Sequence, residues 1–390
     1  MKTAAIVGGG IGGLTAALAL HRRGWQVRVY ERAPALEEVG AAIALAPNAL
    51  RALRTLEIDL SDLAAIGGQG GIRRPDGTWL ARTDIDAVAA GIGDTILLLA
   101  RADLVKRLTD RLPSECLVLG ATVAEVEQNT NAATLRITGE DGESGEEQAT
   151  VVVAADGIWS RLRPLVAPHH SGPRYAGYTC WRFLTRAPRD GFTPAETFGT
   201  GTRFAIMPMT RGRVYCYATA IAPQGERAPD ERAELHRRFA TWHDPIAEVI
   251  DSVRPDEILR NDIWHIPGRL PAYHRGRIVL LGDAAHAMTP DLGQGGCQAI
   301  EDAITLAHHL AATGDAADLT RALRAYTVAR RPRTHAMVRR SALTGRLVHL
   351  KAPAAVWARD RLLWAAERLP ERWFARGIAP IHDWHPPAAG

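Results

Sequence analysis

Three apolar runs in the chain are patterned as buried strands, and the first is followed by an apolar helix. The runs are Lys2–Val7, Val151–Ala155 and Arg277–Leu281. Each is too short for a helix and contains valine or isoleucine, which favours a strand. Residues 14–23 form an Ala/Leu-rich helical stretch, and residues 26–30 return as a further strand. This strand–helix–strand order predicts an α/β fold with a parallel sheet.

A glycine-rich turn joins the first strand to the first helix. Gly8, Gly10 and Gly13 fall in G-x-G-x-x-G spacing, which allows a tight turn, close approach of a pyrophosphate and close packing of helix on strand. The helix N-terminus offers N–H groups to phosphates, and Glu31 after the next strand can accept hydrogen bonds from a ribose. The motif predicts a dinucleotide without separating NAD from FAD; the alternative is a turn of purely structural purpose. The candidate cofactor residues here are Gly8, Gly10, Ile11, Gly12, Gly13, Glu31 and Arg32.

Acidic residues follow the two later strands. Asp156-Gly157 comes at the end of one, and Gly282-Asp283 comes directly after the other. Ligands of a parallel sheet bind at the carboxyl ends of its strands, so Asp283 is placed to hold a polyol such as ribityl. The alternative role for Asp283 is that of a helix N-cap.

A second glycine-rich turn opens an Ala-rich helix at residues 297–312. Its N–H groups would face negative charge developing on a flavin ring. The candidate cofactor residues of this segment are Pro290, Gly293, Gly295 and Gly296. His286 is a candidate base, against the alternative that its segment serves packing and backbone placement. Cys297 is a candidate for a lowered pKa because it stands at a helix start.

The character of the chain changes between residues 176 and 274. Short strand-like runs such as Thr202–Met209 and Arg213–Ala220 are separated by Pro/Gly/Arg turns, and with an insert near 71–97 they predict a second sheet. The candidate substrate contacts on it are Arg182, Arg203, Tyr215 and Tyr217. The two tyrosines are two residues apart on one strand and so share a face. The alternatives are a solvating charge at the sheet edge for the second arginine and a core aromatic for the first tyrosine.

Composition narrows the class of protein. The chain has 390 residues, 46% of them hydrophobic and 23% charged, which is ordinary for a soluble protein with more than one domain. The net charge of +4 is spread without a basic block, which argues against nucleic acid as a partner. No apolar run approaches the ~20 residues of a membrane span, and no signal peptide is recognised, so we expect a cytoplasmic protein. Four widely separated cysteines argue against a disulfide framework or a zinc site.

The C-terminal stretch 353–376 interleaves tryptophans and arginines, among them Trp357, Trp364 and Arg361. This pattern predicts a basic amphipathic helix, broken by Pro370. Such helices usually pack on their own protein or on a dimer partner, and a membrane-surface role is the less favoured reading. We expect a monomer or a homodimer.

The motifs together resemble the single-component FAD-dependent aromatic hydroxylases of the para-hydroxybenzoate hydroxylase fold, the class A flavoprotein monooxygenases. The resemblance runs over about residues 1–345 and rests on Gly8, Gly10 and Gly13 with Glu31, Asp156-Gly157 and Gly282-Asp283. It implies a Rossmann-like FAD-binding domain, an inserted mixed β-sheet substrate domain and C-terminal helices. It also implies that NADH or NADPH reacts from a transient site, with Asp156-Gly157 serving flavin and nicotinamide. A C4a-hydroperoxyflavin formed with dioxygen would then hydroxylate a small aromatic or heteroaromatic substrate.

The resemblance assigns further residues. The segment Gly40-Ala41-Ala42-Ile43, followed by Pro47-Asn48, resembles the one that runs past the isoalloxazine. Arg101 resembles the arginine that contacts the FAD diphosphate and ribityl, and Val123 the residue beside the adenine.

Within the family, segments such as 174–178 and 289–303 look closest to bacterial FAD-dependent urate and salicylate-type hydroxylases. On that likeness Arg203 would pair with an anionic substrate, and Tyr215 would orient it or relay a proton. The proposed catalytic set is Arg203, Tyr215 and His286, and the proposed substrate contacts are Arg182, Arg203, Tyr215, Tyr217 and Pro290.

The predicted division of the chain places the FAD-binding domain at 1–70, 98–175 and 275–345, the substrate domain at 71–97 and 176–274, and a helical segment at 346–390. Several rival functions fit less well. A disulfide reductase needs a cysteine pair soon after the glycine motif, and the first cysteine is Cys116. An amine oxidase would lack the Gly282-Asp283 segment, and the WxWxIP segment of a halogenase is absent. An epoxidase of the same fold and a non-catalytic flavin-binding sensor stay open.

Overall fold

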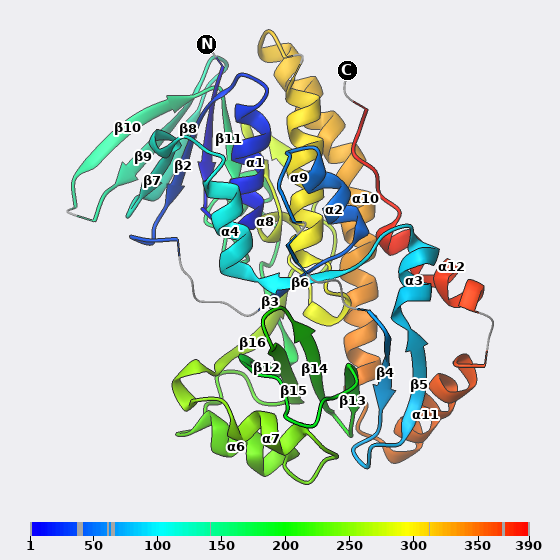
Figure 1. Cartoon of the computed structure of the whole chain (residues 1–390). Helices are drawn as coiled ribbons and strands as arrows, with labels where there is room; N and C mark the ends of the chain where they lie inside the picture. The colour runs from blue at the N-terminus through cyan, green and yellow to red at the C-terminus, as the bar shows by residue number, and fades with distance from the viewer. Residues whose placement is uncertain are drawn as a thin grey trace.

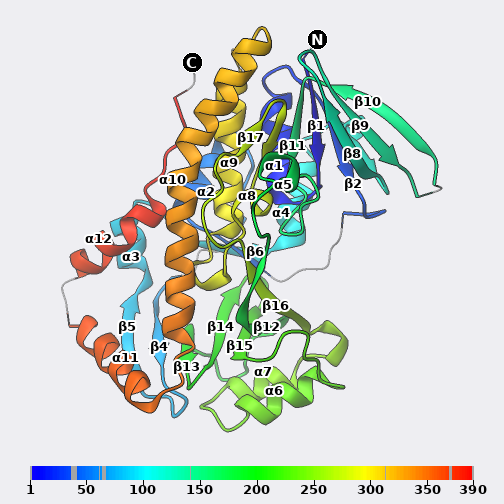
Figure 2. The same ribbon diagram turned by 180° about the vertical axis from the view of Figure 1, so that it is seen from behind.

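A computed structural model of the chain describes residues 2–36, 42–60, 62–63, 67–140, 142–311, 313–368 and 371–388. Figure 1 shows two layered parts, one above the other, with the long helix α10 running beside both. The view from behind in Figure 2 shows the same helix crossing from the upper part to the lower one. The fold is a mixed α/β fold, as the sequence predicts.

The upper part is built on a six-stranded sheet in the order β17-β18-β11-β1-β2-β7. Its strands are β1 (Thr3–Val7), β2 (Gln26–Glu31), β7 (Leu117–Leu119), β11 (Val151–Ala154), β17 (His274–Arg275) and β18 (Ile278–Leu280). All pair in parallel except β17, which is antiparallel to β18. The three apolar runs of the sequence are therefore neighbours, and their carboxyl ends meet at one edge.

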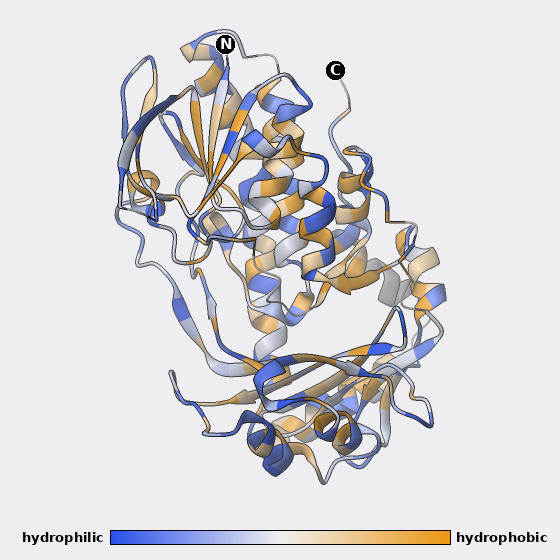
Figure 3. Ribbon diagram, turned by 60° about the vertical axis from the view of Figure 1, so that its left-hand side comes forward, coloured by the Kyte–Doolittle hydropathy of each residue, from blue (hydrophilic) through white to orange (hydrophobic). Residues whose placement is uncertain are grey.

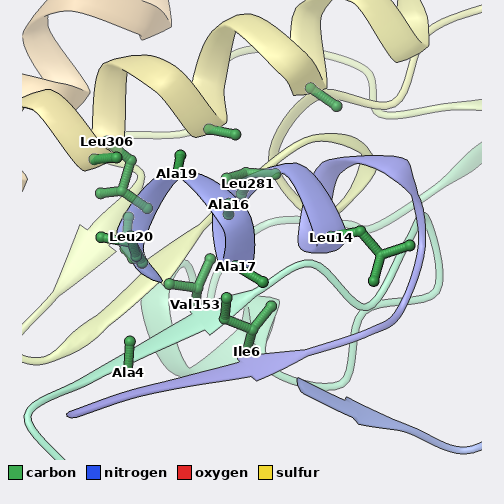
Figure 4. Close-up of a cluster of buried hydrophobic side chains, with 14 of the residues drawn as sticks. Ala4, Ile6, Leu14, Ala16, Ala17, Ala19, Leu20, Val153, Leu281 and Leu306 are labelled. Carbon is green, nitrogen blue, oxygen red and sulfur yellow. The ribbon is translucent and has the colours of Figure 1, made fainter. Parts of the chain in front are cut away.

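Helices cover this sheet. They are α1 (Ile11–His21), α2 (Pro47–Arg54), α4 (Arg101–Thr109), α5 (Arg163–Val166), α8 (Asp283–His286) and α9 (Gly295–Leu310), with short 3-10 turns η1 (Ser114–Cys116) and η3 (Pro290–Leu292). Helix α1 is buried along nearly its whole length. Figure 4 shows its alanines between the β1 and β11 strands below and α9 above. Small side chains here let α1 approach both neighbours closely, which holds the glycine turn against the sheet.

Two small sheets flank this part. One is a three-stranded antiparallel sheet of β8 (Thr122–Gln128), β9 (Ala133–Thr138) and β10 (Ser144–Ala149). The other pairs β3 (Ala42–Leu45) with β6 (Leu97–Ala100). The sequence analysis did not anticipate the three-stranded sheet, because its third strand is almost entirely polar and lacks an alternating pattern.

The lower part is a seven-stranded mixed sheet in the order β16-β12-β15-β14-β13-β4-β5. Its strands are β4 (Gln69–Arg73), β5 (Trp79–Asp84), β12 (Arg174–Arg186), β13 (Ala195–Phe198), β14 (Thr202–Met209), β15 (Arg213–Ile221) and β16 (Leu259–His265). One face packs on α6 (Glu231–Phe239) and α7 (Ile246–Asp251) through a core that includes Trp181, Phe183 and Phe204. The opposite face carries polar residues toward the upper part. A further 3-10 turn, η2 (Pro255–Glu257), precedes β16.

The remaining helices are α3 (Ile85–Ile92), α10 (Ala316–Val348), α11 (Pro353–Ala366) and α12 (Glu371–His382). Helix α10 runs unbroken past residue 345, where the sequence analysis places the end of the FAD-binding domain. Pro370 lies outside the described residues. In Figure 3 hydrophobic and hydrophilic residues mix along the helices, and within the described ranges no helix is long and apolar enough to cross a bilayer.

Candidate active site

The first glycine turn is built so that side chains cannot replace its glycines. Gly8 has a φ of +111°, and a Cβ there would lie 2.3 Å from the carbonyl oxygen of Ala155. A Cβ on Gly13 would lie 2.0 Å from the carbonyl oxygen of Gly8. These contacts bring the turn against β11 and close the start of α1 onto β1. Both glycines are therefore required by the backbone itself.

The space beside Gly10 is open. A Cβ on Gly10 would meet only Nη2 of Arg101, 3.9 Å away. Arg101 is exposed at the start of α4 and forms no ion pair with any described carboxylate. The first N–H groups of α1 have no partner within the helix. Helix N-terminus and guanidinium thus direct positive charge at one open space, which fits a pyrophosphate.

Glu31 is fixed by the backbone of its neighbours. Its Oε2 accepts a hydrogen bond from the Gly9 N–H at 2.6 Å, and its Oε1 accepts one from the Ala33 N–H at 3.0 Å. Each carboxylate oxygen keeps a further acceptor position for ribose hydroxyls. Arg32 beside it is exposed.

The acidic strand ends meet as predicted by their order. Asp283 reaches the solvent-accessible space after β18, close enough to Arg101 and Arg163 for their charges to act on its pKa. Although Asp283 is open to solvent on one side, desolvation by the surrounding protein raises its pKa, and His286 and these two arginines oppose that rise. The Arg163 Nε donates to the Ala284 carbonyl at 2.9 Å and ties the two segments together.

Asp156 caps the turn after its own strand. Its Oδ2 accepts hydrogen bonds from the N–H groups of Arg161 at 2.8 Å and Leu162 at 3.3 Å. Its Oδ1 is buried and has no partner within the described ranges. Gly157 and Gly282 adopt positive φ angles of +77° and +61°, which the sharp turns at both strand ends require.

The second glycine turn lies against the β3 strand. A Cβ on Gly296 would come within 2.6 Å of Cδ1 of Ile43, and Gly293 has a φ of +62°. Asn48, which is fully buried, donates to Oε1 of Gln294 at 3.0 Å and so holds the turn from behind. The N–H groups of Gly295 and Gly296 at the start of α9 have no intrahelical acceptor. Of the expected isoalloxazine segment, Ala42 begins β3, whereas Gly40 and Ala41 lie outside the described residues.

Other predicted cofactor residues lie in the packing beneath the turns. A Cβ on Gly12 would lie 2.8 Å from Cδ2 of Leu281 and 3.1 Å from Cβ of Ala299, so Gly12 lets α1 touch both later motifs. Ile11 is buried in the same core, and Val123 is buried on β8. Pro290 begins η3 and is exposed.

His286 is buried away from the polar face of the lower sheet. Its Nε2 lies 2.5 Å from Oδ2 of Asp302, which also accepts a hydrogen bond from the Gly282 N–H at 3.0 Å. Oδ1 of Asp302 accepts from Nε of Arg330 at 2.6 Å. Burial by itself raises the pKa of Asp302, but His286 and Arg330 outweigh it and hold the pKa below its usual value. The structure therefore does not bring His286 together with Arg203 and Tyr215.

Cys297 does not have the lowered pKa considered from the sequence. The side chain is fully buried in α9, and burial raises its pKa to about 12. This thiol is inert at neutral pH.

Arg203 lies at the centre of a buried polar cluster. It is 3% exposed, which rules out the alternative of a solvating charge at a sheet edge. Its Nη2 lies 3.0 Å from Oδ1 of Asp291, and its Nη1 lies 3.7 Å from Oε1 of Glu196. The hydroxyl of Tyr178 donates to Oδ2 of Asp291 at 2.7 Å. Asp291 belongs to η3, so the cluster joins the second glycine turn to the sheet.

The cluster contains more acidic than basic groups. Burial alone would lower the pKa of Arg203, and the nearby carboxylates of Glu196 and Asp291 outweigh burial and hold that pKa above its ordinary value. Two carboxylates therefore surround one guanidinium. The expectation that Arg203 pairs with an anionic substrate stays a prediction, and in the structure its guanidinium already has acidic partners.

Tyr215, Tyr217 and Arg182 lie on the same face of the sheet as Arg203, as the strand register requires. The rings of the two tyrosines are 5.7 Å apart, and the Tyr217 hydroxyl donates to Glu196. The Tyr215 hydroxyl forms no hydrogen bond with any residue that the structure describes. Nη2 of Arg182 donates to Oδ1 of Asn261 at 2.6 Å, while its Nε is buried and unpartnered.

The sequence patterns did not identify the two acidic residues of the cluster or the histidine that stacks on Tyr178. Asp291 and Glu196 were not among the candidates, nor was His349, whose ring stacks on Tyr178 at 4.1 Å. Only Asp291 carried a signal, since it precedes the second glycine turn. The other two contacts depend on strand pairing and on the end of α10, which local patterns do not reveal.

The geometry of the upper site fits FAD. The open space beside Gly10, the acceptor at Glu31, the carboxylate at Asp283 and the N–H groups of Gly295 and Gly296 follow one another along the strand edge. The face of the lower sheet that carries Arg203 and Tyr215 is the one that α6 and α7 do not cover. In Figure 1 the upper part lies on the side of this sheet away from α6 and α7.

Comparison with known proteins gives the same assignment. The family model described as an FAD binding domain matches residues 1–341. The aurachin C monooxygenase/isomerase of Stigmatella aurantiaca is 39% identical over 368 residues, which is 93% of this chain and 93% of that protein. The FAD-dependent urate hydroxylase of Klebsiella pneumoniae subsp. pneumoniae is 34% identical over 351 residues, covering 86% of this chain and 87% of that protein.

A solved structure matches over nearly the whole length. Klebsiella pneumoniae HpxO complexed with FAD and uric acid superposes with a TM-score of 0.87 at 28% identity, covering 98% of this chain and 97% of that one. The match includes both sheets and therefore both halves of the site.

Proposed function

The chain belongs to this FAD-binding family, and from that premise we propose that it hydroxylates a small planar ring held between the flavin and the polar face of the lower sheet. It is an FAD-dependent monooxygenase, with NAD(P)H as the reductant typical of the family, acting on an aromatic or heteroaromatic substrate. An epoxidase of the same fold is the alternative: one relative is named a hydroxylase, whereas the name monooxygenase/isomerase of the other is compatible with either reaction.

One observation carries the proposal for the site. The ion pair between Arg203 on β14 and Asp291 on η3 links the substrate sheet to the turn that faces the flavin. Both side chains are buried, at 3% and 0% exposure. A buried ion pair is costly to form and is retained where it fixes geometry. We propose that this pair sets the distance between ring and flavin.

The roles of the other residues follow from their free groups. Tyr215 has an unpaired hydroxyl and can orient a ring hydroxyl or relay its proton. Arg182 has no carboxylate partner within the described residues, so we propose that it, rather than Arg203, attracts an anionic substrate. Asp291 can accept a proton from the substrate side through its bond with Tyr178. His286 is proposed to hold Gly282-Asp283 in place rather than to act as a base.

Bound FAD supplies the activated oxygen, and the protein supplies the binding and proton steps. The four cysteines are free and buried, which fits a reducing compartment such as the cytoplasm.

The test is product formed per NAD(P)H consumed, measured with urate and with simple phenols at saturating concentration. Tyr215→Phe and Arg203→Met are expected to retain FAD and to divert reducing equivalents to hydrogen peroxide. A positioned general acid or base contributes about 10²–10⁴-fold, so the rate of hydroxylation should fall by about this factor in Tyr215→Phe. Arg203→Met should lower the rate as well, because it breaks the ion pair that positions the ring.

Two matched variants control this experiment. Tyr30→Phe removes a hydroxyl bonded to Glu147 on the far side of the upper sheet, and Arg136→Met removes an exposed pair with Glu125. Both should leave coupling unchanged. Full coupling and full rate in both site variants would remove Arg203 and Tyr215 from the site.

A further inference from the structure

Two adjoining cavities lie against the C-terminal half of α10, and most of the residues that line them have no role in the site described above. Their volumes are about 280 Å³ and about 520 Å³. Arg174, His265, Ala342 and Arg346 line both of them. The larger cavity also reaches Arg339 on the same helix.

The lining is basic and lacks acids. No described Asp or Glu lines either cavity. Arg174, Arg339 and Arg346 form no ion pair with the carboxylates that the structure describes. All three are exposed. The buried arginines Arg203 and Arg330, in contrast, have acidic partners. The uncompensated charge makes the cavities attractive to an anion.

His265 supplies a second and independent sign of a ligand. It ends β16, lies in register with Arg174 on β12, and is only 7% exposed. Neither ring nitrogen has a hydrogen-bond partner in the part of the chain that the structure describes. Burying an imidazole without partners costs free energy that a bound acceptor would return. Burial, with Arg174 and Arg346 nearby, lowers the pKa of His265, so the ring is a neutral donor at pH 7.

The smaller cavity also borders the active site. Thr289, Tyr178 and His349 line its inner end, and Tyr178 donates to Asp291 in the turn that faces the flavin. A ligand held by Arg174 and Arg346 at the outer end would therefore lie beside that turn.

We propose that the cavity formed by Arg174, His265 and Arg346 binds a phosphate group. Guanidinium groups bind tetrahedral oxyanions through paired hydrogen bonds, and a neutral imidazole adds one donor. The group can belong to the nicotinamide coenzyme or be free inorganic phosphate. The first source rests on the function proposed above; the site itself does not.

Calorimetric titration of the FAD-loaded protein with inorganic phosphate tests the site without turnover. The wild type is expected to bind phosphate, and Arg346→Ala to weaken the binding at least about tenfold, because it removes charge-assisted hydrogen bonds. Arg346 is exposed, so its removal leaves the core intact. Arg321→Ala is the matched control: it lies on the same helix, pairs with Asp318 and lines neither cavity.

Steady-state kinetics with NADH and NADPH then identifies the source. If the coenzyme phosphate occupies the site, Arg346→Ala raises KM for the coenzyme with little change in kcat, and phosphate competes with the coenzyme. If the source is free phosphate, only the calorimetric binding is lost. Both outcomes support the site. Absence of phosphate binding in the wild type together with an unchanged coenzyme KM in Arg346→Ala overturns it, as does equal weakening by Arg321→Ala. Failure of hydroxylation alone leaves the calorimetric result standing.

Discussion

At the scale of residues, the arginines of the site fall into two kinds: those with an acidic partner and those without one among the described residues. Arg203 and Arg330 are buried with acidic partners, whereas Arg101 and Arg182 have none among the described residues. Partnered arginines are positioning groups, because removing one leaves a buried carboxylate unpaired at a cost of about 3–5 kcal/mol. Unpartnered arginines are free to meet an anionic group of a ligand. Arg101, which adjoins the open space beside Gly10, therefore stays our proposed contact for the FAD diphosphate.

Among the acidic residues, Asp283 likewise forms no ion pair with a described residue and can bind a ligand group. Asp283→Ala should raise the dissociation constant of FAD by roughly ten- to a hundredfold, because a hydrogen bond to a charged group is worth about 1.5–3 kcal/mol. Flavin fluorescence during titration of the apoprotein measures the constant. Asp110→Ala, which removes an exposed pair with Lys106, is the control. An unchanged constant in Asp283→Ala would place the ribityl chain elsewhere.

At the scale of elements, the sequence predicted the strands that carry the site with little error. Strand β14 has the predicted bounds, and β11 and β15 each differ by one residue at one end. These strands are apolar or alternate cleanly, so local pattern and burial agree. Helices α1 and α9 begin two or three residues earlier than predicted, because the glycines of each turn already belong to the helix.

What the sequence could not predict depends on contacts between distant elements. The pairing of Arg203 with Asp291 joins residues 88 positions apart, and that of His349 with Thr219 joins residues 130 apart. Neither pairing has a local pattern. The predicted catalytic trio therefore included His286, which stands near the right motif but has its partner within the upper part.

The packing of α10 on η3 gives a prediction at this scale. A Cβ on Gly345 would lie 2.5 Å from Oδ2 of Asp291, an atom already fixed by Tyr178. Gly345→Ala would gain about 1 kcal/mol of helix propensity, but forcing a methyl into a packed site costs about 1–3 kcal/mol. We expect a small net loss of stability in urea unfolding and a larger loss of coupling. Thr344→Ala on the same turn should show neither; full coupling in Gly345→Ala would contradict the role of the Arg203–Asp291 pair.

At the scale of the whole molecule, His349 joins the two parts and makes that junction sensitive to acid. Its Nδ1 lies 2.7 Å from the Gly345 carbonyl oxygen and its Nε2 lies 2.9 Å from the Thr219 hydroxyl. Burial, followed by the charge of Arg203, lowers the pKa of His349 to about 4. The unfolded chain takes up this proton near pH 6.5, whereas the folded protein resists it down to about pH 4.

Stability contributed by neutral His349 is therefore complete above pH 6.5 and lost as the pH falls toward 4, by an amount on the order of 3 kcal/mol. Urea unfolding at pH 7, 6 and 5 should show stability falling with pH. In His349→Gln the slope should be smaller by up to about 1.4 kcal/mol per pH unit. His382, whose pKa burial also lowers to about 4, remains in the variant and keeps part of the slope. Equal slopes in the two proteins would contradict the assignment.

Helix α10 fixes the spacing of the two parts through contacts at two places along its length. Near its middle Arg330 and Arg333 contact Glu301 behind the flavin turn, and near its end Gly345 contacts Asp291. One residue inserted between Arg333 and Gly345 would rotate the C-terminal end of the helix by about 100° and shift it by about 1.5 Å along the axis. Both sets of contacts could not survive such a change. The chain can thus vary in length at its surface loops, but the number of residues from Arg333 to Gly345 is fixed by these two sets of contacts.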